Sequence, residues 1–192
     1  MAPKTSEQYR EIRESRRKQI LETALQLFAE QGYTHTSVRM IAEQAGISKG
    51  LLYNYFKSKE ELLDRIIQEG FEEILKDFDP DNDGTLTREE LGLYIDRVFE
   101  SLRKNRNYFN LLFALMIQPQ VMSHIIPLYE SKIASVFTMV ADYFGRTGFE
   151  DPMSESMLFL AHLDGIAFHY IVRPEEYPLD KVAEALKKRY IK

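Results

Sequence analysis

The chain has 192 residues, no cysteine, 44% hydrophobic residues and a formal net charge of −5. These values exclude a disulfide framework and a thiolate metal site, and they are typical of a globular protein with one large or two smaller domains. The sequence begins without an apolar signal segment, and no run approaches the ~18 apolar residues of a membrane span. We therefore expect a cytoplasmic protein with no membrane partner.

Three helices are predicted near the N-terminus. The first is indicated by an apolar stripe within residues 16–33, and Gly32 ends it. The second covers residues 38–45, where apolar residues recur every three or four positions. Gly46 supplies the positive φ of a tight turn. Ser48 can then cap a third helix, Ser48–Tyr55. Two helices joined by such a glycine turn are typical of a unit that places its second helix in the DNA major groove.

Residues 32–38 read Gly-Tyr-Thr-His-Thr-Ser-Val, residues 41–56 read Ile-Ala-Glu-Gln-Ala-Gly-Ile-Ser-Lys-Gly-Leu-Leu-Tyr-Asn-Tyr-Phe, and residues 57–62 read Lys-Ser-Lys-Glu-Glu-Leu. This segment resembles the DNA-binding domain of TetR-family transcriptional regulators. The match covers about a quarter of the chain. It implies an all-α protein with a three-helix helix-turn-helix domain at 1–58 and a helical-bundle effector-binding and dimerisation domain at 59–192.

Polar groups on and around the third helix are the predicted DNA contacts. Lys49 can reach a guanine edge or a phosphate, Tyr53 a phosphate or a thymine methyl, and Asn54 an adenine. Each could instead be an ordinary surface residue. The full predicted set is Thr36, Ser37, Arg39, Ser48, Lys49, Gly50, Tyr53, Asn54, Tyr55 and Lys59. Residues 1–69 carry a net charge of +1 and residues 70–192 one of −6, so the positive charge lies where phosphates would bind.

The rest of the chain is predicted to be helical. The expected helices cover residues 62–78, 88–105, 108–117, 127–145, 153–172 and 179–190. Pro127 is expected to open the fourth of these. The segment 153–172 is apolar most of the way round, which indicates burial on both sides. Together with residues 179–190 it is the predicted dimer interface, as the family resemblance also implies.

Residues 79–90 match the twelve-residue EF-hand calcium loop. They read Asp-Pro-Asp-Asn-Asp-Gly-Thr-Leu-Thr-Arg-Glu-Glu, with oxygen-bearing residues at the ligand positions and Gly84 at the sharp turn. The predicted Ca²⁺ ligands are Asp79, Asp81, Asp83, Thr85, Thr87 and Glu90. The alternative is a solvated acidic turn, because Asp-Asn-Asp-Gly is also common turn chemistry.

Aromatic and methionine side chains are frequent in the middle of the chain and are mostly expected in the core. A TetR-like regulator would open an apolar effector cavity there. The predicted lining is Phe109, Phe113, Met116, Tyr129, Phe137, Phe159 and His162. No catalytic constellation or Gly-rich phosphate loop is present, so we do not expect an enzyme.

The prediction is a homodimeric repressor, released from a palindromic operator by a small apolar effector, with calcium as a candidate modulator. The alternatives are a Ca²⁺ sensor or buffer, and an enzyme that uses the cavity.

Overall fold

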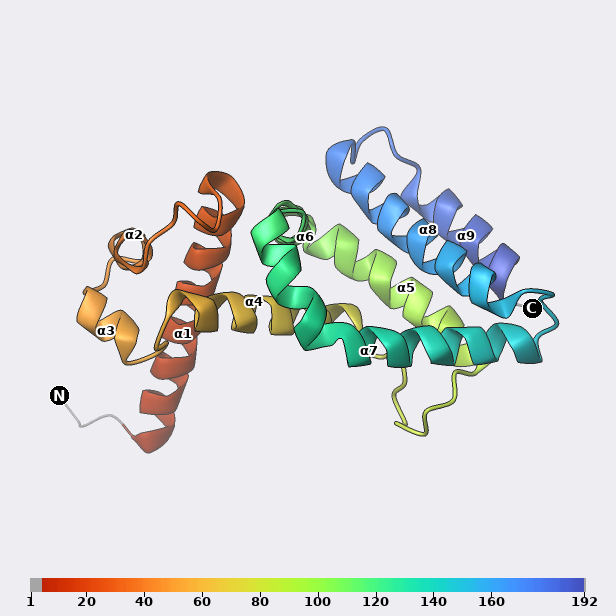
Figure 1. The fold of residues 1–192 in the computed structure, drawn as a ribbon, viewed down its shortest axis with the longest axis horizontal. Coiled ribbons are helices and arrows are strands. Elements are labelled where there is room, and N and C mark those ends of the chain that lie inside the picture. The colour runs from red at the N-terminus through yellow and green to blue at the C-terminus, as the bar shows by residue number, and fades with distance from the viewer. Residues whose placement is uncertain (1–4, 192) are drawn as a thin grey trace. The chain divides into compact units, whose positions relative to one another are not determined.

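The computed structural model describes residues 5–191, and the regular elements within that range are all α-helices (Figure 1). This confirms the all-α prediction. The helices are α1 (Ser6–Gln31), α2 (Val38–Gln44), α3 (Lys49–Tyr53), α4 (Lys59–Ile74), α5 (Arg88–Lys104), α6 (Arg106–Met116), α7 (Pro119–Arg146), α8 (Pro152–Val172) and α9 (Leu179–Tyr190). Residues 1–4 and 192, to which the predicted domain limits extend, lie outside the described residues.

The chain divides into two compact units. The first holds the described residues up to Gly70 together with Leu111–Ile125, and the second holds Phe71–Asn110 and the described residues from Ile126 onward. The predicted boundary at residue 58 therefore falls inside the first unit. Its core includes Ile20, Ala24, Phe28, Ile41, Ala42, Leu52, Phe56, Leu62, Leu63 and Ile67, all buried.

Helix α1 begins at Ser6, ten residues before the predicted start. Thr5 and Gln8 form a capping box, in which the Thr5 hydroxyl accepts from the Gln8 N–H and the Gln8 side chain accepts from the Thr5 N–H. Residues 5–15 are exposed, so they show no apolar periodicity from which a helix could be predicted. The cap explains how this polar segment stays helical.

Two other helix limits differ from prediction. Helix α4 ends at Ile74 and not at residue 78, because Asp77 has a positive φ of 63° and Phe78 turns into the core of the second unit against Tyr94. Helix α7 begins at Pro119, and Pro127 lies inside it. Pro119 takes the first helical position, where a missing N–H costs nothing. Pro127 removes one internal hydrogen bond and its ring crowds the carbonyl four residues earlier, yet α7 continues through it.

The second unit packs α5, α8 and α9 around an aromatic core, and α8 and α9 lie side by side (Figure 1). Tyr190 is fully buried there, between the rings of Phe144 and Phe159, and its hydroxyl lies 2.9 Å from His162 Nδ1. No single described helix is long and apolar enough to cross a membrane; α6 and α7 have the required length and composition only as a pair, bent by 96°.

Candidate functional site

Helices α2 and α3 are joined by the turn that the sequence predicts. Ser37 caps α2 by accepting from the Met40 N–H at 3.2 Å, and Ser48 caps α3 by accepting from the Leu51 N–H at 3.1 Å. Between them, Gly46 has a φ of 66° and its N–H donates to the Glu43 carbonyl. Short capped helices with a left-handed glycine between them form a helix-turn-helix.

The outer face of α3 is polar and open to solvent. Lys49, Gly50, Tyr53 and Asn54 are all exposed, while Leu52 is fully buried in the first unit. The Lys49 ammonium lies 5.8 Å from the centre of the Tyr53 ring. The helix therefore holds a cation, an aromatic hydroxyl and an amide on a single exposed surface.

Thr36 and Arg39, both predicted DNA contacts, have hydrogen-bond partners within the chain. Thr36 is only 1% exposed, and its hydroxyl donates to the Leu27 and Gly32 carbonyls. Its predicted role as a hydroxyl donor to DNA is wrong, because the hydroxyl ties the end of α1 to the following loop. Arg39 is exposed as predicted, but its Nε donates to Glu43 one turn later at 2.7 Å, and this pairing raises the Arg39 pKa.

Lys59 points into the loop between α1 and α2. Its Nζ donates to the carbonyls of Tyr33 at 2.9 Å, Thr34 at 3.5 Å and Thr36 at 3.1 Å, and it lies 4.3 Å from the centre of the Tyr33 ring. An ammonium has three protons, and these carbonyls engage all of them. The predicted phosphate contact by Lys59 stays a prediction, and the geometry gives this side chain a second role as a clamp on the loop.

The Tyr33 ring under this ammonium is kept neutral. Burial, followed by the negative charge of Glu60, raises the pKa of Tyr33 to about 12. The hydroxyl therefore remains a donor at neutral pH, and it reaches Glu60 Oε1 at 3.5 Å. Tyr33 thus links the loop to the first turn of α4.

Arginines of α1 lie against the aromatic residues that follow α3. The Arg13 guanidinium lies 5.5 Å from the centre of the Tyr55 ring, and Arg17 lies 5.4 Å from the centre of the Phe56 ring. Arg17 also donates to Glu69 at 3.3 Å. The predicted site omitted both arginines, although residues 1–18 hold six basic residues against three acidic ones, which was a signal for them. Tyr55 is half-buried and Ser37 and Ser48 are exposed.

The residue that sequence reasoning missed entirely is Gln118. It lies between α6 and α7, and its side-chain amide bonds both the Phe28 carbonyl and the Tyr33 N–H. A single glutamine in an apolar segment carries no pattern that could predict these bonds.

The acidic loop brings three of its predicted ligands together. One carboxylate oxygen from each of Asp79, Asp81 and Asp83 lies within 4.8 Å of the others. Gly84 has a φ of 76° and donates its N–H to Asp79 Oδ2 at 3.2 Å. The other oxygen, Asp79 Oδ1, is buried and has no hydrogen-bond partner. A buried carboxylate oxygen without a partner is costly, and a cation would supply the missing partner.

Glu90 and Thr87 lie outside this cluster and cap α5 instead. The Glu90 carboxylate accepts from the Thr87 N–H at 2.8 Å and from its hydroxyl at 2.7 Å. The Thr85 N–H donates to Asp83 Oδ1 at 2.7 Å. A hydrogen bond from the Asp83 N–H lowers the pKa of Asp81, but desolvation and the charges of Asp83 and Glu90 outweigh it, and the net pKa is raised.

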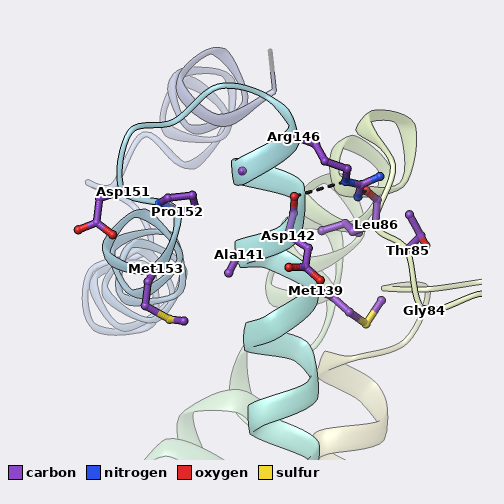
Figure 2. Close-up of a pocket in the computed structure, with 11 residues that line it drawn as sticks. Gly84, Thr85, Leu86, Met139, Ala141, Asp142, Arg146, Asp151, Pro152 and Met153 are labelled. Atoms are coloured by element: carbon purple, nitrogen blue, oxygen red, sulfur yellow. Dashed lines mark hydrogen bonds between the residues drawn. The ribbon is translucent and has the colours of Figure 1, made fainter.

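The C-terminal half of the acidic loop packs into the core of the second unit, to which the loop belongs. Leu86 is fully buried in its core, and the Leu86 carbonyl accepts from Arg146 Nη2 at 2.7 Å. Figure 2 shows Arg146 reaching across from α7 while its Nε donates to the Asp142 carbonyl. The loop, α7 and the start of α8 line an open pocket. Its lining is Gly84, Thr85, Leu86, Met139, Ala141, Asp142, Gly145, Arg146, Asp151, Pro152 and Met153.

The predicted effector-pocket residues are different ones. Phe113 and Met116 belong to the first unit, and Phe109, Tyr129, Phe137, Phe159 and His162 belong to the second. Phe159 is fully buried among other rings, and Tyr129 stacks on Phe71 with ring centres 4.6 Å apart. None of the predicted set lines the pocket of Figure 2, so the effector cavity stays a prediction.

Sequence similarity to known proteins is concentrated on the first unit. Residues 20–66 match the family model described as bacterial regulatory proteins, tetR family. The uncharacterized HTH-type transcriptional regulator YfiR of Bacillus subtilis is 32% identical over 103 residues, which are 54% of this chain and 49% of YfiR. The HTH-type transcriptional repressor KstR2 of Mycolicibacterium smegmatis is 44% identical over 78 residues, which are 41% of this chain and 32% of KstR2. The chain spans about half or less of the length of these curated relatives.

Structural similarity extends over nearly the whole chain. The crystal structure of a transcriptional regulator (TerR/AcrR family) from Aquifex aeolicus VF5 matches with a TM-score of 0.64 and 27% identity, over 91% of this chain and 96% of that one. The second unit therefore shares its fold with that regulator, although the sequence family is recognised from the first unit alone.

Proposed function

We propose that this chain, which belongs to the tetR family of bacterial regulatory proteins, is a sequence-specific DNA-binding repressor. The observation that carries the proposal is the capped helix-turn-helix with Lys49, Tyr53 and Asn54 on the exposed face of α3. In this arrangement the second helix enters the major groove and its side chains reach base edges. The assignment of the regulator as a repressor rests on its similarity to KstR2, whose name describes a repressor.

Affinity for DNA would come mainly from phosphate contacts. The exposed start of α1 carries Arg10 and Arg13, half-buried Arg16 follows, and Ser37 and Ser48 cap the two short helices. Basic side chains that replace counterions supply most of the affinity, while the few groups on α3 supply the base preference. The net charge of −6 over residues 70–192 disfavours binding through the rest of the chain.

The test is binding to a duplex that the chain itself selects from a random DNA library. We expect Lys49→Ala and Tyr53→Ala each to weaken binding by about 1–3 kcal/mol without loss of helicity. Lys132→Ala is the control, since Lys132 is also an exposed lysine, on α7. Failure to select any duplex, or unchanged affinity in both α3 variants, would remove α3 from the groove.

The regulator is proposed to act as a homodimer through α8 and α9. Along α8, Met157, Leu158, Phe168 and Val172 are each 46–58% exposed, which is a large apolar surface for a lone subunit. A palindromic operator with half-sites about 34–36 Å apart would match such a dimer. A small apolar effector that changes the spacing of the two helix-turn-helix units would then release the DNA.

Gly165 on α8 offers a direct test of the dimer. A Cβ built at Gly165 meets no atom within 4 Å in the same chain, so a larger side chain fits the lone subunit. Gly165→Leu should therefore lower the dimer fraction in sedimentation analysis while the helicity of the subunit is kept, with Gly165→Ala as the smaller step. A Leu variant that dimerises like the parent chain would place the interface elsewhere.

A second proposal is that the Asp79–Glu90 loop binds one Ca²⁺ ion. The specific observation in its favour is Asp79 Oδ1, which is buried and unpartnered beside two further carboxylates, in a segment with the EF-hand residue pattern. Six or seven oxygens at about 2.3–2.6 Å are expected for this ion. They would come from Asp79, Asp81, Asp83, the Thr85 carbonyl, Glu90 and water held by Thr87. Glu90 must first leave its capping bonds to Thr87.

Calorimetry with Ca²⁺ tests this second proposal. We expect one site in the parent chain, strongly weakened in Glu90→Gln and unchanged in Glu89→Gln, since Glu89 is exposed next to it and is no EF-hand ligand position. No binding up to millimolar Ca²⁺ would leave only an acidic turn. Binding that leaves DNA affinity equal in Ca²⁺ and in chelator would make the ion structural and not regulatory.

A further inference from the structure

We propose that Gln118 is a positioning residue for DNA binding, an inference that rests on the DNA-binding function proposed above. Gln118 lies in the break between α6, which ends at Met116, and α7, which begins at Pro119. Its Nε2 donates to the Phe28 carbonyl at 2.7 Å and to the Ala114 carbonyl at 3.3 Å. Its Oε1 accepts from the Tyr33 N–H at 2.8 Å. All of these residues belong to the first unit.

These bonds cap the C-terminal end of α1 from a segment about 90 positions away in the sequence. The last four carbonyls of a helix have no partner within the helix. The Gln118 amide has one donor and one acceptor group in the orientation needed to engage both sides of this end. It therefore fixes the direction in which the chain leaves α1.

That direction sets where α2 begins. Only residues 32–37 separate α1 from the first residue of α2, and Ser37 is its cap. Lys59 holds the Tyr33 and Thr36 carbonyls of the same loop, so the loop is held by two side chains at once. Without the Gln118 bonds, the loop keeps the Lys59 clamp and the Thr36 hydroxyl bonds to the end of α1, but Tyr33 loses its link to the segment between α6 and α7. We expect α2 and α3 then to sample orientations that fit the groove poorly.

The Gln118 bonds also connect the break between α6 and α7 to the loop that precedes α2. A movement of residues 117–118 changes the Phe28 and Tyr33 bonds first, because they are made by the side chain at the break itself. No contact of Gln118 with DNA is required. Loss of a positioning residue and loss of a phosphate contact therefore differ in their effect on the salt dependence of DNA binding.

The variants are Gln118→Met, which keeps the length of the side chain but makes no amide bonds, and Gln118→Glu. Gln120→Met is the matched control, because Gln120 is exposed two residues further along. Binding is measured on the duplex selected by the parent chain, over a series of salt concentrations. Hydrogen exchange of the peptide that contains Tyr33 is measured in the same samples.

We expect Gln118→Met to weaken DNA binding roughly 10-fold, equivalent to about 1.4 kcal/mol. The slope of affinity against salt should be unchanged, because no phosphate contact is lost. Exchange around Tyr33 should speed up, and the Gln120→Met control should match the parent chain in all three measurements.

Gln118→Glu supplies a rescue. A neutral carboxylic acid has an O–H donor and a carbonyl acceptor, like the amide, whereas an ionised carboxylate would face the Phe28 carbonyl with a second acceptor. DNA affinity of Gln118→Glu, taken relative to Gln118→Met at each pH, should therefore recover as pH falls and the carboxyl protonates. Absence of any such recovery would count against the amide bonds as the cause.

Three other outcomes are distinguishable. Unchanged DNA affinity in folded Gln118→Met, with or without a lower unfolding midpoint, would reduce Gln118 to a stabilising residue and overturn the proposal. Weaker binding with a shallower salt slope would mean a lost phosphate contact, which also overturns it. A parent chain that selects no duplex would overturn the DNA-binding function itself, and with it this inference.

Discussion

Two loops of the molecule meet the same electrostatic problem in opposite ways. In the loop between α1 and α2, backbone carbonyls converge and the chain supplies a cation, the Lys59 ammonium, at 2.9–3.5 Å from three of them. In the loop between α4 and α5, the carboxylates of Asp79, Asp81 and Asp83 converge. Among the described residues, no ion pair joins these three carboxylates to a basic side chain.

Within the described part of the chain, only the second loop lacks a cationic partner. Convergent oxygens need a positive partner, because their mutual repulsion grows when they leave water. The first loop receives its partner when the chain folds, so its conformation is complete without any ligand. The second can receive one only from solution. Removing the internal cation and removing an external one should therefore have parallel effects on the two loops.

The largest expected effect is the stabilisation of the second loop by calcium. At a Ca²⁺ concentration of about 100 times the dissociation constant, a single site adds about 2.7 kcal/mol to the free energy of unfolding. Asp79→Asn should abolish this gain and, in chelator, should be more stable than the parent chain, since it removes one of three crowded carboxylate charges. Denaturant unfolding with Ca²⁺ and with chelator gives both values. Equal unfolding of the parent chain in the two conditions would end the comparison.

The second effect is the removal of the internal cation. Lys59→Met should lower the free energy of unfolding by about 2 kcal/mol, because hydrogen bonds from a charged donor contribute about 1.5–3 kcal/mol. Lys57→Met is the control, since Lys57 is exposed and two residues away. The salt slope of DNA binding adds a second reading. A slope reduced by about 1 in Lys59→Met would support the predicted phosphate contact, and an unchanged slope would support the clamp.

More of the first unit than of the second could be predicted from the sequence. Gly46, Ser48 and the apolar spacing of α2 determine a local geometry, so the helix-turn-helix could be predicted from adjacent residues. The exposure of Lys49 and Tyr53 followed from the same periodicity. The burial of Thr36 did not, because its partners at Leu27 and Gly32 depend on how α1 ends.

Contacts between distant segments were beyond the reach of periodicity. Gln118 meets Phe28 and Tyr33, and Arg146 meets Leu86, through bonds that span 60 to 90 positions. A lone polar residue has no repeating pattern, so its partner is fixed only by the packing of helices around it. Pro127 shows the converse error, since a local rule placed a helix start where tertiary packing continues α7.

The third prediction compares the two glycine turns. Gly46 and Gly84 have φ values of 66° and 76°, and a Cβ at either position would meet no atom within 4 Å. Alanine at either should therefore cost only the backbone strain of positive φ, about 1 kcal/mol, and the two losses should be similar. The functional losses should separate: Gly46→Ala weakens DNA binding and Gly84→Ala weakens Ca²⁺ binding, as gel shift and calorimetry would show. Loss of Ca²⁺ binding in Gly46→Ala would indicate that the two turns are coupled.

The smallest expected effect is a dependence of stability on pH in the second loop. The charges of Asp83 and Glu90 and desolvation outweigh the hydrogen bond from the Asp83 N–H, so the pKa of Asp81 is raised above its ordinary value of 3.8. A raised folded-state pKa contributes stability that is present below the unfolded value and is lost as pH rises through the folded value. In calcium-free buffer, the parent chain should therefore gain stability relative to Asp81→Asn as pH falls toward 3.8. Saturating Ca²⁺ should reverse the sign, because the ion binds the ionised carboxylate and competes with the proton. Urea unfolding of both chains across this pH range, with and without the ion, tests the reversal. If the stability difference between the two chains has the same sign with and without Ca²⁺, no cation binds the carboxylates of the second loop in the way that Lys59 binds the carbonyls of the first.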